Sequence, residues 1–224
     1  MIFFDIDGTL FDQENAEKLA AIRFFKENVI DLQVDSREFV ALRNIYYNNL
    51  IMNLQKELPL QERNRTLMRD LFGHHISNEI ADQKARDFLN LYKQNWIPFH
   101  DVIPCLEQLK SKNYNLGIIS NGDYDRQIDK LDRLGVKQYF DILTISNQKS
   151  LTKPNKHIFL AACNEANIKP EQAYYIGDHL VYDAIASKNC GMNGIWLNRK
   201  NQTTYNDLNV IHGLDELINI IDSK

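Results

Sequence analysis

Cysteine is scarce in this chain of 224 residues, and its three copies, Cys105, Cys163 and Cys190, form no Cys-x-x-Cys pair. A disulfide framework or a thiolate zinc site is therefore not expected, and a reducing compartment fits better. A basic excess is also lacking, because 26 Lys and Arg residues stand against 30 Asp and Glu residues and give a net charge of −4. This balance argues against a nucleic acid polymer as partner, since its phosphates would need cations to neutralise them.

Long apolar segments are missing as well. No apolar run approaches the ~18 residues that a membrane-spanning helix needs. The apolar start of the chain is interrupted by Asp5 and Asp7 and has no basic flank, unlike a secretory signal peptide. We therefore expect a cytoplasmic protein that does not associate with a membrane.

Glycine and proline are rare between residues 12 and 93, where only Pro59 and Gly73 occur. Apolar residues recur in this stretch at the spacing of amphipathic helices. We expect four helices here, forming a bundle over residues 13–96. The apolar positions of the first predicted helix are Leu19, Ile22, Phe25 and Val29.

After Pro98 the pattern changes to short β-branched runs that alternate with helical segments. Such alternation predicts a parallel sheet covered by helices on both faces. One strand, at residues 2–6, precedes the helical stretch, and the others follow it at 116–119, 141–145, 173–177 and 194–197. We therefore predict an α/β fold with a Rossmann-like parallel sheet. The Rossmann-like core is expected at residues 1–12 and 97–224, with residues 13–96 as an inserted α-helical bundle.

Polar residues follow four of the predicted strands. They are Asp5-Ile6-Asp7-Gly8-Thr9, Ser120-Asn121-Gly122, Lys153-Pro154 and Gly177-Asp178, with Asp183 five residues further on. Ligands of such α/β domains bind at the carboxyl ends of the strands. Each cluster alone is more simply explained as a turn or a solvated side chain. All four in this order favour a shared site instead.

These residue types together suit one kind of chemistry. Three carboxylates can hold Mg²⁺, which prefers oxygen ligands and leaves open positions for phosphate. A carboxylate oxygen can attack phosphorus while a cation and a lysine neutralise the developing charge. A second carboxylate can protonate the leaving oxygen and then activate water.

The order DxDGT, S-N-G, K-P and GDxxxxD resembles the haloacid dehalogenase (HAD) superfamily of phosphohydrolases, over essentially the whole chain. The helical insertion after the first motif resembles the helical cap of that superfamily. The segments KPNKHIF at 153–159 and GIWLNR at 194–199 further resemble the branch with bacterial nucleotidases and other small-metabolite phosphatases.

The resemblance implies a role for each acid. Asp5 would be the nucleophile, forming an aspartyl-phosphate, and would also bind Mg²⁺. Asp7 would be the general acid and base, with its backbone carbonyl on the metal. Asp178 would bind Mg²⁺ through its side chain, and Asp183 would complete or orient the metal ligands. Dehalogenases of this superfamily lack the second acid, so the presence of Asp7 favours a phosphatase.

The resemblance also implies phosphate-binding groups. Ser120 and the amide of Asn121 would bind the phosphoryl oxygens. Lys153 would contact Asp5 and the phosphoryl group and keep the nucleophile ionised through its opposite charge.

The leading hypothesis is a Mg²⁺-dependent phosphomonoesterase acting on a small phosphorylated metabolite, a nucleotide or a sugar phosphate, as a monomer or a weak homodimer. The alternatives are a phosphomutase and a non-catalytic regulatory protein that kept the fold. In the second predicted helix Arg43, Tyr46 and Asn49 share a face. That face either contacts the substrate or is partly core and partly solvated.

Overall fold

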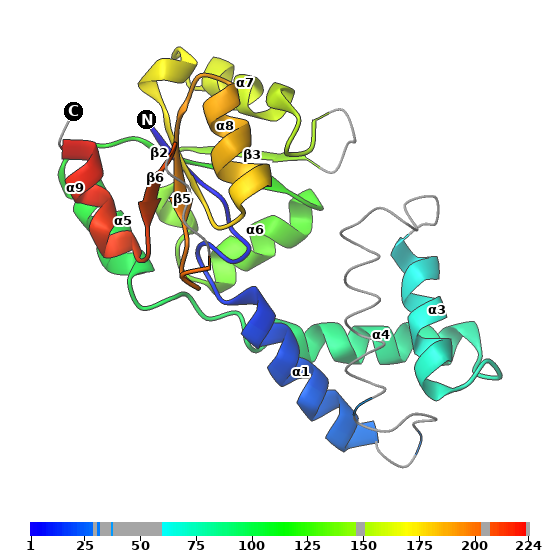
Figure 1. The fold of residues 1–224 in the computed structure, drawn as a ribbon. Coiled ribbons are helices and arrows are strands. Elements are labelled where there is room, and N and C mark those ends of the chain that lie inside the picture. Colours follow the sequence, from blue (N-terminus) through cyan, green and yellow to red (C-terminus); the bar gives the residue numbers. More distant parts are fainter. Residues whose placement is uncertain (29–30, 32–36, 38–59, 147–150, 203–206, 223–224) are drawn as a thin grey trace. The chain divides into compact units, whose positions relative to one another are not determined.

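The computed structural model describes residues 1–28, 31, 37, 60–146, 151–202 and 207–222 (Figure 1). The chain divides into two compact units, one formed by Met1–Gln13 with Trp96–Lys224 and the other by Glu14–Asn95. The first unit is thus built from two separate stretches, with the second inserted between them. The face with Arg43, Tyr46 and Asn49 lies outside the described residues. Among the residues described, no helix has both the length and the apolar character to cross a membrane.

A parallel sheet of six strands, in the order β3-β2-β1-β4-β5-β6, forms the centre of the first unit. The predicted α/β fold with a Rossmann-like parallel sheet is therefore confirmed. The sequence had not indicated β6, which is a three-residue strand at the edge of the sheet. The strands are β1 Ile2–Phe4, β2 Leu116–Asn121, β3 Ile142–Ser146, β4 Tyr174–Gly177, β5 Asn193–Leu197 and β6 Asn209–Ile211.

Strand β1 lies in the middle of the sheet because its residues are wholly apolar and can be buried on both faces. Phe4 pairs with Ile118 of β2 on one side and with Ile176 of β4 on the other. From β1 the strand order runs to β2 and β3 in one direction and to β4 and β5 in the other. A ligand site is expected at such a change of direction, at the carboxyl ends of the strands.

Helices cover both faces of the sheet. Figure 1 shows α7 and α8 on one side, with α5, α6 and α9 on the other. This arrangement follows from right-handed crossovers, since the chain moves toward β3 through α5 and α6 and returns through α7 and α8. The helices are α5 Val102–Ser111, α6 Tyr124–Arg133, α7 Lys156–Glu165, α8 Ala186–Asn189 and α9 Leu217–Asp222, with short 3₁₀ turns at Lys137–Tyr139, Pro170–Gln172 and Leu214–Glu216.

The helical segment that follows β4 begins with a wide turn. Leu180–Ile185 is a π-helix that continues into α8. The backbone N–H groups of Asp183 and Ala184 both reach the carbonyl of His179, at 2.9 and 3.4 Å. π-turns are rare and often occur at functional sites, and this one carries Asp183.

The second unit is mainly helical over its described residues. Its helices are α1 Gln13–Asn28, α3 Leu60–Phe72 and α4 Asn78–Lys93. Phe24 of α1 packs edge to face against Phe72 and Phe88, with ring centroids 5.8 and 5.6 Å apart. The buried face of α1 is formed by Ala16, Ala20, Ala21, Phe24 and Asn28, whereas Leu19 and Ile22 are exposed.

Candidate active site

Asp5 lies directly after β1 and is only 6% exposed. Its backbone N–H donates to the carbonyl of Ile176 in β4 at 2.9 Å, which fixes the residue beside the end of that strand. Its Oδ1 accepts a hydrogen bond from Ser120 Oγ at 2.9 Å and lies 2.7 Å from Lys153 Nζ. The structure thus brings together three residues that the sequence placed after three different strands.

Lys153 is buried between two carboxylates. Its Nζ lies 2.7 Å from Asp5 Oδ1, 2.7 Å from Asp183 Oδ1 and 2.9 Å from the hydroxyl of Tyr175. Burial alone would lower the pKa of Lys153, but the charges of Asp183 and Asp5 outweigh it and raise that pKa. The ammonium group therefore stays charged at every physiological pH.

The side chain of Asn121 holds the segment that carries Lys153. Asn121 Oδ1 accepts from the backbone N–H of Lys153 at 2.7 Å, and its Nδ2 donates to the backbone carbonyl of Lys153 at 3.0 Å. This paired contact ties the end of β2 to the Lys153 loop. Phosphate binding by the backbone amide of Asn121 stays a prediction.

Three carboxylates converge at the ends of β1 and β4. One oxygen from each of Asp5, Asp178 and Asp183 can be chosen so that all lie within 4.8 Å of one another. Burial, with the neighbouring carboxylates, raises the pKa of Asp178 and raises that of Asp5 to about 6. Only oxygen donors are present, and close like charges favour a cation between them, so the set fits a hard divalent ion such as Mg²⁺.

Lys153 was expected to keep Asp5 ionised. Its charge does act in that direction, but burial is the larger effect on the pKa of Asp5. In the metal-free protein, the lysine therefore offsets only part of the cost of a buried carboxylate. A bound divalent cation would add positive charge and lower the pKa further.

Two glycines make room for these acids. A Cβ on Gly8 would lie 2.3 Å from Asp178 Oδ2, and a Cβ on Gly177 would lie 2.4 Å from Asp183 Cγ. Gly8 also has a φ of +78°, a conformation that favours glycine. Any side chain at either position would displace a carboxylate of the cluster.

Asp7 makes contacts of its own. Its Oδ1 lies 2.5 Å from Lys130 Nζ, and its Oδ2 accepts from Gln127 Nε2 at 3.1 Å. Its carboxylate is not in the cluster of Asp5, Asp178 and Asp183. The expectation that its backbone carbonyl binds the metal stays a prediction.

The loop after β1 is anchored from two sides. Thr9 Oγ1 accepts from the backbone N–H of Asp178 at 3.1 Å, and the carbonyl of Thr9 accepts from Arg199 Nη2 at 3.1 Å. Arg199 also forms a two-point ion pair with Asp101, at 2.7 and 2.9 Å, and stacks on Phe99. These contacts hold the loop that carries Asp7.

Sequence reasoning missed four residues that support the site: Tyr175, Gln127, Lys130 and Arg199. The first signal was the second of two adjacent tyrosines in β4, Tyr175, which is buried where a hydroxyl needs a partner. The second was a polar pair, Gln127 and Lys130, on the same helix face as Leu131, all of which is buried. Polar residues on a buried face need partners, and here the partners are residues of the site.

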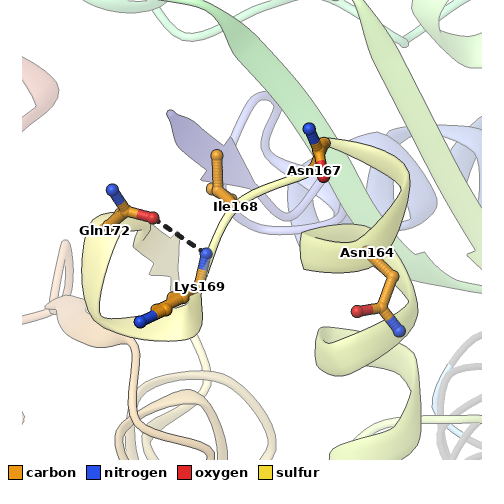
Figure 2. Close-up of a pocket in the computed structure, with 5 residues that line it drawn as sticks. All are labelled: Asn164, Asn167, Ile168, Lys169 and Gln172. Carbon is orange, nitrogen blue, oxygen red and sulfur yellow. Dashed lines mark hydrogen bonds between the residues drawn. The ribbon is translucent and has the colours of Figure 1, made fainter.

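A separate pocket of about 370 Å³ is open to the surface elsewhere in the first unit (Figure 2). It lies between the end of α7 and the start of β4, on the side of the sheet where the amino ends of the strands lie. Figure 2 shows the backbone N–H of Lys169 donating to Gln172 Oε1, a bond of 3.0 Å. None of the residues predicted for the site lines this pocket, whose lining is Asn164, Asn167, Ile168, Lys169 and Gln172.

Known proteins resemble this chain in sequence. A glyceraldehyde 3-phosphate phosphatase of Methanopyrus kandleri is 37% identical over 198 residues, which cover 85% of this chain and 80% of that protein. The pyrimidine 5'-nucleotidase YjjG of Escherichia coli is 29% identical over 202 residues, covering 88% of this chain and 85% of the relative.

A solved structure resembles it in fold. The HAD-hydrolase YfnB of Bacillus subtilis, bound to magnesium, superposes with a TM-score of 0.76 at 20% identity, covering 99% of this chain and 97% of that one. In addition, the sequence model of the haloacid dehalogenase-like hydrolases matches residues 2–197. The matched region includes every residue of the cluster described above, and the chain therefore belongs to the haloacid dehalogenase-like hydrolase family.

Proposed function

We propose that this protein is a Mg²⁺-dependent phosphomonoesterase that hydrolyses a small phosphorylated metabolite through an aspartyl-phosphate on Asp5. The observation that carries the proposal is the placement of Lys153, with its Nζ 2.7 Å from both Asp5 and Asp183. A buried carboxylate that is oriented by a lysine and a serine is a suitable nucleophile for phosphorus.

In the first step a carboxylate oxygen of Asp5 forms a bond to phosphorus while the bond to the leaving oxygen breaks. Ser120 Oγ and Lys153 Nζ hold the Asp5 carboxylate in place, and each would exchange its bond to Asp5 for one to a phosphoryl oxygen as the reaction proceeds. Asp7 must be protonated when the substrate is bound, and it gives this proton to the leaving oxygen, which departs as an alcohol.

In the second step a water molecule attacks phosphorus and the bond to Asp5 breaks. Asp7, now ionised, accepts the proton of the attacking water, so that Asp5 and Asp7 both return to their starting states. The products are inorganic phosphate and the alcohol.

Asp5, Asp178 and Asp183 would hold Mg²⁺. Support comes from their all-oxygen donor set and the raised pKa values of two of them. When bound, the ion would neutralise charge that develops on the phosphoryl group.

The two relatives named above point to sugar phosphates and nucleoside monophosphates as substrate classes. We propose further that the unit Glu14–Asn95 acts as a helical cap that supplies substrate selectivity. An insertion directly after the catalytic strand can serve as a lid.

The test is phosphate release by the purified protein with Mg²⁺ across glyceraldehyde 3-phosphate, other sugar phosphates, phosphoglycolate, phosphoserine and nucleoside monophosphates. Rapid release from one class supports the proposal. An isomerised sugar phosphate without free phosphate would instead identify a phosphomutase. Halide release from a 2-haloacid would identify a dehalogenase, and no turnover of any compound would favour a regulatory protein.

A further inference from the structure

Lys130 is a buried cation, only 4% exposed, on the inner face of α6. Its Nζ lies 2.5 Å from Asp7 Oδ1. The same Nζ lies 5.6 Å from the ring centroid of Phe11 and 5.7 Å from that of Trp96. A buried ammonium group is costly unless it is paired, so its contact with Asp7 and the two ring faces fixes its position.

Gln127, one turn earlier on α6, holds the other oxygen of the same carboxylate. It is 2% exposed, and its Nε2 lies 3.1 Å from Asp7 Oδ2, 3.2 Å from Ser120 Oγ and 2.8 Å from the carbonyl of Asn121. The amide group has two hydrogens, so it serves at most two of these acceptors at once. Gln127 therefore joins the loop after β1 to the end of β2.

These contacts connect the two acids of the proposed mechanism. Gln127 Nε2 can donate to Asp7 and to Ser120 Oγ, and Ser120 Oγ donates to Asp5 Oδ1. Two side chains, those of Gln127 and Ser120, therefore link Asp7 to Asp5. The packing is close, because a Cβ on Gly122 would lie 3.0 Å from Gln127 Nε2.

We propose that Lys130 and Gln127 are positioning residues for Asp7. They hold one carboxylate oxygen each and so fix the direction from which Asp7 reaches the leaving oxygen and the attacking water. This inference rests on the proposed function, because it assigns the pair to the acid and base of that reaction. Proton transfer depends on the placement of the transferring group, and a misplacement of about 1 Å can cost about 100-fold in rate.

Lys130→Met tests the role of the lysine. Methionine keeps an unbranched apolar chain between Phe11 and Trp96 but removes the charge. The expected result is a fall in kcat of about 10- to 100-fold on an alkyl phosphate, with KM nearly unchanged. On p-nitrophenyl phosphate, whose leaving group needs little protonation, kcat should fall less than about 3-fold.

The matched control is Arg133→Met, because Arg133 is a cation on the same helix in an exposed pair with Asp129. It should leave both substrates unaffected. Lys130→Arg keeps the charge and should recover part of the alkyl phosphatase activity. Gln127→Met should repeat the substrate-dependent loss in weaker form, because one oxygen of Asp7 is still held by Lys130.

A double-mutant cycle separates positioning from a purely structural effect. In an Asp7→Asn background, Lys130→Met should lower kcat by less than about 2-fold, because the carboxylate that it positions is already gone. If the losses in kcat from Asp7→Asn and Lys130→Met multiplied in the double variant, the proposal would be overturned. Equal losses in kcat on the alkyl and p-nitrophenyl phosphates, or faster turnover of the alkyl phosphate, in Lys130→Met would also overturn it. If the wild-type protein released no phosphate, the proposed function itself would fail. Phosphate release that depends on Asp7 but not on Lys130 would refute only this inference.

Discussion

Replacement of the proposed nucleophile should affect activity and stability in opposite directions. Asp5→Asn keeps the shape of the side chain and an oxygen that can accept from Ser120 and Lys153, which both contact Asp5 Oδ1. The amide cannot attack phosphorus as a carboxylate can, so phosphate release should fall by several orders of magnitude. The same change removes a buried negative charge from the carboxylate cluster.

The size of the stability effect follows from the pKa of Asp5. Burial, partly offset by Lys153, raises this pKa from 3.8 to about 6. Between these values the folded protein keeps a proton that the unfolded chain has lost, so the free energy of unfolding falls as pH rises. At about 1.36 kcal/mol for each pKa unit, the ionised group costs the metal-free protein about 3 kcal/mol at neutral pH.

Urea unfolding in a chelator measures this difference. Asp5→Asn should be more stable than the wild type at neutral pH, by up to about 3 kcal/mol, and the difference should shrink toward about pH 4. Added Mg²⁺ should stabilise the wild type more than the variant, because the variant has lost one proposed ligand. A variant that is less stable than the wild type at neutral pH without metal would refute the reasoning.

Three further predictions concern the metal, the glycine beside it and the anchored loop. Phosphate release should stop in a chelator and return with Mg²⁺ but not with Ca²⁺, which accepts looser geometry; full activity without metal would contradict the proposed site. Gly177→Ala should lower kcat at least about 100-fold, because the new Cβ would displace Asp183 by about 1 Å. Circular dichroism should show that the variant is still folded, and wild-type activity would contradict the prediction. Burial would raise the pKa of Asp101, but hydrogen bonds, chiefly from Arg199, outweigh it and hold that pKa below its ordinary value. The ionised Asp101 therefore stabilises the folded protein at neutral pH, and this stabilisation is lost as pH falls through the lowered pKa. Asp101→Asn should therefore lower the free energy of unfolding at neutral pH by about 3 kcal/mol, and urea unfolding that shows no loss there would contradict this account.

The parallel sheet could be predicted because its signals are local. Short apolar runs between helical segments indicated the strands, and the scarcity of glycine and proline between residues 12 and 93 indicated helices there. The edge strand β6 was missed because only one of its three residues is buried, which leaves almost no apolar pattern.

The candidate acids could also be found by position alone. Asp5 and Asp178 each follow a buried strand directly, and parallel strands bring their carboxyl ends to one edge. For these two residues, the positions of the strand ends in the sequence were enough to predict that their side chains lie close together.

The partners of these acids were decided by the tertiary structure. Lys130 lies 123 positions from Asp7, and a lysine on a helix is ordinarily exposed. Only the packing of α6 against the loop after β1 buries Lys130 and directs it to Asp7. The pKa of Asp5 likewise depends on how far the folded protein excludes water from it and on which charges lie nearby, and neither quantity is set by neighbours in the sequence.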